Sequence, residues 1–297
     1  MAVTLRRLSR DTVPMSTSAI TPAAGAISLP SAPAMHRQAS RAGRSVHDLL
    51  APLVKLVAQS QVLRADSLGC WRSGEDLLFL PRFFFQRRKV HKPRIKVGIF
   101  AGIHGDEAGS VLGLMQLPRA LECYPEMGRN YQLWLYPLCN PGGYIDGTRE
   151  SRSGKDLNRE FWKNSSELEV QLLEKEISKQ RFNGIISLHC DDTSYGVYGF
   201  GGGALNERLL KQGLAAAERA LPRNTAAQID GFRASHGIIE SRYDGILSAP
   251  ADQRPAPFEI VLETPHHAPM RQQGHAFLFG LHAILAEYRQ LECTTKT

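Results

Sequence analysis

Four short stretches of the chain are almost continuously apolar and rich in β-branched or aromatic residues: 95–103, 131–139, 183–190 and 258–263. Near-continuous apolarity over this length is typical of strands that are covered on both faces of a sheet. Helices are the usual cover for such strands. The four stretches therefore predict the centre of a mostly parallel α/β sheet.

Amphipathic segments lie between and after these strands, at 110–122, 166–181, 204–221 and 274–291. Each predicts a helix, and Pro118 interrupts the apolar stripe of the first. The segment 166–181 opens with Ser166 and Glu169, which have the spacing of a capping box. Strands that alternate with helices predict an α/β three-layer sandwich, with a mostly parallel mixed sheet and helices on both faces.

Residues 1–45 have a different composition, rich in Ala, Ser, Pro and Thr and without a periodic apolar face. They predict a disordered N-terminal extension, followed by a single domain at 46–297. The extension is rich in arginine and contains one acid. Three alternatives stay open: a plain extension, an organellar transit peptide, or a start codon assigned too early, with Met15 and Met35 downstream.

The charge and the cysteines exclude several classes of protein. Six arginines and one aspartate give the extension +5 of the net charge of +7, so the remaining chain carries only +2. A folded part this close to neutral argues against a nucleic-acid partner. No apolar run approaches the roughly 20 residues that cross a bilayer, so we expect no membrane partner. Five cysteines without CxxC spacing predict a reducing, cytoplasmic location, or an organellar one if the extension is a transit peptide.

Polar residues stand where the predicted strands end: His104, Asn140, His189 and Glu263. In parallel sheets, ligands bind at the carboxyl ends of the strands. Glu107 follows His104 closely, and a catalytic zinc ion takes three protein ligands from His, Asp or Glu. An HxxE pair alone also occurs by chance on a solvated helix. With His189 from a second strand end, the pair predicts a metal site.

Two further features could belong to the same site. The segment 140–162 is long, polar and glycine-rich, which favours a functional loop over a solvated basic connection. The strand 258–263 carries Glu259 and Glu263 among apolar residues, and burying a carboxylate is costly unless it is paired or functional. Glu263, at the strand end, is better placed to face a cleft. Glu259 is expected to be paired or at a sheet edge.

The motifs "GIHGDE", "NPGGY…TRES…GKDLNREF", "SLHC" and "LETP" occur in the order found in the zinc carboxypeptidase superfamily. The chain resembles that superfamily from about residue 95 to 290. The superfamily contains metallocarboxypeptidases, bacterial cell-wall peptide amidases, and the succinylglutamate desuccinylase/aspartoacylase branch.

The resemblance implies one zinc ion per chain and a role for each matching residue. It implies His104, Glu107 and His189 as zinc ligands, Glu263 as general base and acid, Arg149 (or, less favoured, Arg152) at the oxyanion, Asn158 and Arg159 at the substrate carboxylate, and Asp156 as hydrogen-bond acceptor for His104.

The chain also departs from the family pattern. After "SLH" it reads "CDDTSYGVYGFGGG", so Asp191 and Asp192 either add negative charge to the pocket or cap a turn. Carboxypeptidases use a mobile tyrosine before the final glutamate, and Tyr243 is the candidate for this substrate-binding role. His266 and His267 follow Glu263 closely and either line the cleft or lie on the surface.

The leading interpretation is a carboxypeptidase-like zinc hydrolase, which cleaves the amide bond next to a free carboxylate in a small peptide. The alternative is an N-acyl amino acid deacylase of the succinylglutamate desuccinylase/aspartoacylase type. That branch commonly carries a β-rich C-terminal domain, whereas only 34 residues follow Glu263 here, which favours an open cleft. A non-catalytic binding module is the third hypothesis, and the complete set of ligand and base positions argues against it.

Overall fold

The computed structural model describes residues 44–87, 95–239, 241 and 243–294. Residues 1–43 of the predicted N-terminal extension lie outside this part of the chain. Ser45 caps the first helix, α1 (Val46–Gln59), by accepting a hydrogen bond from the backbone N–H of Asp48 at 3.2 Å. Among the described residues, no helix has the length and apolar character needed to span a bilayer.

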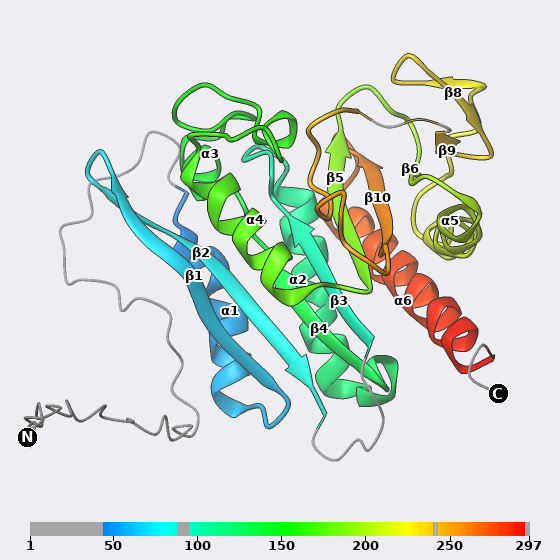
Figure 1. Cartoon of the computed structure of the whole chain (residues 1–297), viewed down its shortest axis with the longest axis horizontal. Helices are drawn as coiled ribbons and strands as arrows, with labels where there is room; N and C mark the ends of the chain where they lie inside the picture. Colours follow the sequence, from blue (N-terminus) through cyan, green and yellow to red (C-terminus); the bar gives the residue numbers. More distant parts are fainter. Residues whose placement is uncertain (1–43, 88–94, 240, 242, 295–297) are drawn as a thin grey trace, which may run out of the picture.

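The four apolar stretches form adjacent parallel strands at the centre of the sheet (Figure 1). They are, in spatial order, β4 (Tyr131–Tyr136), β3 (Ile95–Ala101), β5 (Gly184–Asp191) and β10 (Phe258–Pro265). All eight residues of β5 are buried except the last, which is half-buried. The sequence pattern therefore predicted these strands correctly, because burial on both faces leaves no polar alternation.

Shorter or less regular strands extend this centre on both sides and make the sheet mixed. Within the described residues the sheet has ten strands in the order β1-β2-β4-β3-β5-β10-β6-β9-β8-β7. The added strands are β1 (Leu63–Ser73) and β2 (Asp76–Gln86) beside β4, and β6 (Tyr198–Phe200), β9 (Ile238–Ile239), β8 (Phe232–Ser235) and β7 (Gln228–Ile229) beside β10. The sequence pattern did not predict them, because none is a long uninterrupted apolar run; even β2 is interrupted by Pro81 and Arg82.

Helices cover both faces of the sheet, as the predicted three-layer sandwich requires (Figure 1). One face packs on a core that includes Leu114, Leu135 and Phe277, and the other on a core that includes Phe100 and Tyr136. The first layer consists of α1, α2 (Ala108–Cys123), α5 (Ala204–Ala217) and α6 (Met270–Thr294), and the second of α4 (Leu168–Gln180). Three short helical elements lie in the connections: η1 (Pro125–Gly128) between α2 and β4, and α3 (Pro141–Asp146) and η2 (Leu157–Arg159) between β4 and α4.

The helix α2 continues through Pro118 to Cys123. One local expectation is wrong. The capping box at Ser166 does not form, because α4 begins at Leu168 with Glu167 as its N-cap and without a side-chain cap. The Ser166 hydroxyl instead accepts a hydrogen bond from Lys155 at 3.2 Å. A long-range partner has replaced the local one.

Candidate active site

The turn that follows β3 brings His104 and Glu107 together. Gly102 has a φ of +60°, a conformation that favours glycine and turns the chain out of the strand. Gly105 lets the turn lie against α3, because an added Cβ would be 2.0 Å from the carbonyl carbon of Gly143. The Nδ1 atom of His104 contacts Oε1 of Glu107, and both side chains are buried.

His189 reaches the same point from the carboxyl end of β5. Its Nδ1 atom lies 3.3 Å from Nδ1 of His104 and 3.2 Å from Oε2 of Glu107. One potential ligand atom from each residue lies within 4.8 Å of the other two. Buried nitrogen and carboxylate oxygen atoms that face one another at this distance favour a proton or a metal ion between them. The three side chains could therefore hold a metal ion.

Each histidine has its second ring nitrogen fixed by a hydrogen-bond partner. His104 Nε2 lies 3.1 Å from Oδ1 of Asp156, and His189 Nε2 lies 2.9 Å from Oγ of Ser187. Such partners orient metal-binding imidazoles and direct the other nitrogen to the ion. Two histidines and a carboxylate oriented in this way fit zinc. Asp156 was expected here, whereas Ser187 was missed, although its place two residues before His189 puts both side chains on one face of the strand.

Burial and the neighbouring charges set the protonation of the three groups. Burial opposes ionisation of Glu107, but the two histidines outweigh burial and lower the pKa of its carboxyl group. Burial lowers the pKa of His104, but Glu107 and Asp156 outweigh it and bring that pKa to about 9. Burial lowers the pKa of His189. The cluster thus contains an ionised carboxylate in a buried position, which favours a bound cation.

Glu263 lies next to this cluster on the neighbouring strand β10. The strand register pairs it with His189 of β5 on one side and with Tyr198 of β6 on the other. Burial, together with the nearby charges of Glu107 and Asp191, holds the pKa of Glu263 well above its usual range. A carboxyl group with a raised pKa is suited to accept and return a proton.

The two candidate arginines of the loop 140–162 have different surroundings. Arg149 lines the cleft, with Nη1 3.6 Å from Oε1 of Glu107 and Nη2 3.2 Å from Oδ2 of Asp156. Arg152 does not line the cleft, and forms ion pairs with Asp76 at 2.6 Å and with Asp146 at 2.8 Å. Arg149 is therefore the arginine that faces the candidate metal site.

Asn140, at the end of β4, supports the cleft without lining it. Its side chain caps α3 by accepting a hydrogen bond from the N–H of Gly143 at 2.8 Å. Its amide also donates to the carbonyl groups of Arg149 at 3.3 Å and Glu150 at 3.2 Å. The other three strand-end residues do converge on the cleft. Asn140 instead holds the backbone of the loop that carries Arg149.

Asn158 and Arg159 line the cleft from η2, and Tyr243 lines it from a separate loop. The guanidinium carbon of Arg159 lies 4.2 Å from the centroid of the Tyr243 ring, within the range of a cation–π contact. The hydroxyl of Tyr243 donates to Oδ2 of Asp230, which holds the ring in place. Tyr243 therefore also orients Arg159, which the sequence did not indicate.

Asp191 has both of the roles that the sequence left open. Its carboxylate accepts a hydrogen bond at 2.7 Å from the N–H two residues later, and another at 2.9 Å from the Tyr198 hydroxyl, while it lines the cleft. Asp192 also lines the cleft. Of the two histidines after Glu263, His266 lines the cleft, whereas His267 is exposed and does not.

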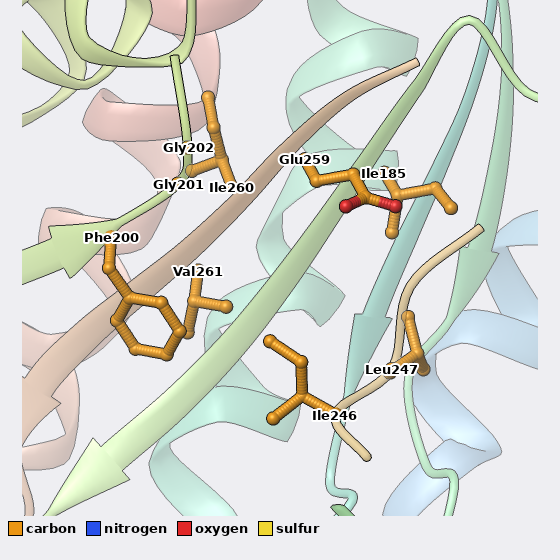
Figure 2. Close-up of a pocket in the computed structure, with 9 residues that line it drawn as sticks. All are labelled: Ile185, Phe200, Gly201, Gly202, Ile246, Leu247, Glu259, Ile260 and Val261. Carbon is orange, nitrogen blue, oxygen red and sulfur yellow. The ribbon is translucent and has the colours of Figure 1, made fainter. Parts of the chain in front are cut away.

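These side chains share one open cleft of about 410 Å³. A much smaller cavity of about 20 Å³ lies along β5, β6 and β10, and Figure 2 shows the side chains around it. Phe200 lines both hollows. Glu259 lines the smaller one, and its Oε1 accepts a hydrogen bond from the N–H of Ala249 at 2.6 Å. Glu259 is thus hydrogen-bonded, as one alternative predicted, and it is not on an edge strand.

Several residues that line the cleft were not predicted, among them Asp106, Tyr198 and Asp230. Asp106 lies between His104 and Glu107, so its position alone could have indicated it. Tyr198 and Asp230 come from the short strand β6 and the turn between β7 and β8. Those elements are too short for a hydrophobic pattern to reveal them.

Comparisons with known proteins agree with this geometry. Residues 93–233 match the succinylglutamate desuccinylase/aspartoacylase catalytic domain. A candidate metallopeptidase from Shewanella denitrificans OS217 has a similar structure, with a TM-score of 0.68 and 22% identity, over 82% of this chain and 90% of that chain. A metallo-carboxypeptidase from Burkholderia cenocepacia gives a TM-score of 0.66 and 18% identity, over 84% and 70% of the two chains.

A metallo-carboxypeptidase from Pseudomonas aeruginosa, in complex with (2-guanidinoethylmercapto)succinic acid, gives a TM-score of 0.62 and 16% identity, over 81% of this chain and 68% of that chain. No curated protein matches the chain. The match at 93–233 and the carboxypeptidase-like fold confirm the predicted resemblance. The chain is therefore similar to the zinc carboxypeptidase-like superfamily in part of its sequence and in its fold.

Proposed function

We propose that the chain is a zinc-dependent hydrolase that cleaves an amide bond next to a free carboxylate, in the manner of a metallocarboxypeptidase. One observation carries the proposal. The cluster of His104, Glu107 and His189 faces a cleft. Glu263, Arg149 and Arg159 line the same cleft. A metal site, a proton carrier and two anion-binding groups are the parts that amide hydrolysis requires.

His104, Glu107 and His189 would hold one zinc ion per chain. When bound, the ion would polarise the scissile carbonyl group and lower the pKa of the attacking water. The carboxylate of Glu263 would take a proton from that water and return it to the nitrogen of the leaving amine. Its raised pKa, caused first by burial, makes the carboxylate a stronger base for the first half of this transfer, in which it accepts the proton.

Arg149 would donate to the oxyanion that develops on the carbonyl oxygen, since it is the arginine beside the metal cluster. Arg159 would bind the free carboxylate of the substrate through its planar guanidinium group, which suits a carboxylate geometrically. Asn158 would add a hydrogen bond from the same turn. Tyr243, stacked on Arg159, would keep the guanidinium in one orientation before substrate arrives.

The match to the desuccinylase/aspartoacylase domain favours a second candidate, an N-acyl amino acid deacylase. Both reactions split the same bond, between an acyl carbonyl and the nitrogen of an amino acid with a free carboxylate. They differ in the acyl half, which is a peptide in one case and a small acid in the other. The cleft is open to solvent, which supports the peptide.

The test begins with protein purified without chelator and with its metal measured by mass spectrometry. The protein, His104→Ala and Glu263→Gln are then assayed on blocked dipeptides and tripeptides with a free C-terminus and on N-succinyl and N-acetyl amino acids. We expect about one zinc per chain in the parent and in Glu263→Gln, with little in His104→Ala. Hydrolysis should be lost in both variants.

The outcomes separate the candidates. Cleavage of the peptides supports the carboxypeptidase-like function, whereas cleavage of the small N-acyl amino acids alone supports the deacylase. A parent protein that binds no zinc, even when zinc is added, contradicts the proposal. A zinc-loaded parent that cleaves none of these amides contradicts it as well.

A further inference from the structure

A buried glutamine in the first turn of α6 connects the strand ends that carry the site. Gln273 is 1% exposed. Its Oε1 atom accepts hydrogen bonds from the Cys190 thiol and the Thr264 hydroxyl, each at 3.2 Å. Its Nε2 atom donates to the carbonyl groups of His266 at 3.1 Å and Ala268 at 2.6 Å. One amide therefore ties α6 to β5, to β10 and to the loop after β10.

The two donors to Oε1 are neighbours of site residues. Cys190 follows His189 in β5, and its backbone N–H donates to Oε2 of Glu107 at 3.0 Å. Thr264 follows Glu263 in β10 and is paired with Cys190 in the register of the two strands. A shift of the Gln273 amide would therefore be transmitted to the metal cluster on one side and to the proposed proton carrier on the other.

The helix α2 contacts the same amide from a third side. A Cβ atom on Gly109 would lie 1.8 Å from Oε1 of Gln273 and 3.1 Å from Sγ of Cys190. Gly109 comes two residues after Glu107, in the first turn of α2. The absence of a side chain there lets the helix approach closely. The amide is thus enclosed by the elements that supply Glu107, His189 and Glu263.

We propose that Gln273 is a positioning residue, which fixes the distance between Glu263 and the metal-binding cluster. The proposal rests on the hydrolase function proposed above. A buried amide whose oxygen and nitrogen are both hydrogen-bonded has one arrangement that satisfies every partner. Proton transfer depends steeply on such placement, and a misplacement of about 1 Å can lower a rate about 100-fold.

The central variant is Gln273→Met, which keeps the length of the side chain and removes its hydrogen bonds. The matched control is Tyr131→Phe, which removes a buried hydrogen bond of 2.6 Å from Tyr131 to the carbonyl group of Leu285 in the same helix. Leu285 is 12 residues further along α6, about 18 Å from Gln273 at 1.5 Å per residue. Both variants lose a buried hydrogen bond, but only one is near the site.

We expect Gln273→Met to lower kcat by about tenfold or more, with KM changed by less than about threefold, because placement and not substrate binding is affected. Tyr131→Phe should lower the melting temperature to a similar extent and leave kcat unchanged. A kcat for Gln273→Met within about twofold of the parent, or an equal loss in Tyr131→Phe, overturns the proposal.

A second readout does not depend on hydrolysis, so that failure of the proposed function can be distinguished. The visible absorption of the protein loaded with cobalt(II) reports the geometry of the metal site. We expect this spectrum and the zinc Kd to change in Gln273→Met and to stay the same in Tyr131→Phe. If the spectrum and the Kd are unchanged in both, the positioning role is wrong, whatever the substrate.

If Gln273→Met does not fold, Thr264→Val takes its place, because valine has nearly the same shape as threonine and lacks the hydroxyl donor. A fall in kcat of about threefold, accompanied by a changed cobalt spectrum, supports the proposal. A variant with the kcat and the spectrum of the parent overturns it.

Discussion

The replacement of Ser187 by alanine tests whether the hydrogen bond behind His189 contributes to metal affinity. The Ser187 hydroxyl lies 2.9 Å from Nε2 of His189, and each residue is 2% exposed. The variant removes this partner and changes little else. Loss of such a partner lowers metal affinity by about 10–100-fold. A neutral hydroxyl orients the ring less strongly than a carboxylate would. We therefore expect a loss of zinc affinity at the lower end of this range, about tenfold, which is about 1.4 kcal/mol of binding free energy.

The assay is competition for zinc with a chromophoric chelator at neutral pH, on metal-free parent and variant protein. The matched control is Ser194→Ala, another buried serine, whose hydroxyl donates to the carbonyl group of Gly196 at 2.7 Å. The control should keep the zinc Kd of the parent. If Ser187→Ala also keeps it, to within about twofold, then the ring of His189 is held by the fold alone and the reasoning from its partner is refuted.

Three other changes have definite expected outcomes. Gly105→Ala places a Cβ against the backbone of α3, so it should displace the metal-binding turn and abolish zinc binding in the chelator assay; full zinc binding would contradict this. Tyr243→Leu removes the ring under Arg159 and should raise KM several-fold more than Tyr243→Phe, which keeps the ring; equal KM values would show that the stack has no role. Glu176 is buried and forms an ion pair with the guanidinium of Arg82 at 2.7 Å. Glu176→Ala removes this ion pair and should lower the free energy of unfolding in urea by about 3 kcal/mol. A loss below about 1 kcal/mol would contradict this expectation.

The sequence alone predicted the parallel centre of the sheet, because strands buried on both faces must be apolar at nearly every position. It also predicted that His104, His189 and Glu263 would meet. Parallel strands end at the same edge, so polar residues at their ends are brought together whatever the details of packing. The candidate metal cluster and the proposed proton carrier were accessible to sequence reasoning for this reason.

Local patterns failed where a distant partner competes for the same group. The spacing of Ser166 and Glu169 fits a capping box, but Lys155 binds the serine hydroxyl and α4 begins two residues later. Asn140 stands at a strand end as the site residues do, but its side chain is used to cap α3. Neither outcome follows from spacing, since each depends on what another element places beside the residue.

Only the tertiary structure decided which of two similar residues faces the cleft and what holds the site residues in place. Arg149 and Arg152 are three positions apart in one loop, and the ion pairs of Arg152 with Asp76 and Asp146 direct it away from the cleft. Gln273 lies behind the site and contacts Cys190 of β5, which is 83 residues away in the sequence. Sequence periodicity records which face of an element is buried, whereas the partner that meets a side chain is set by the packing of whole elements.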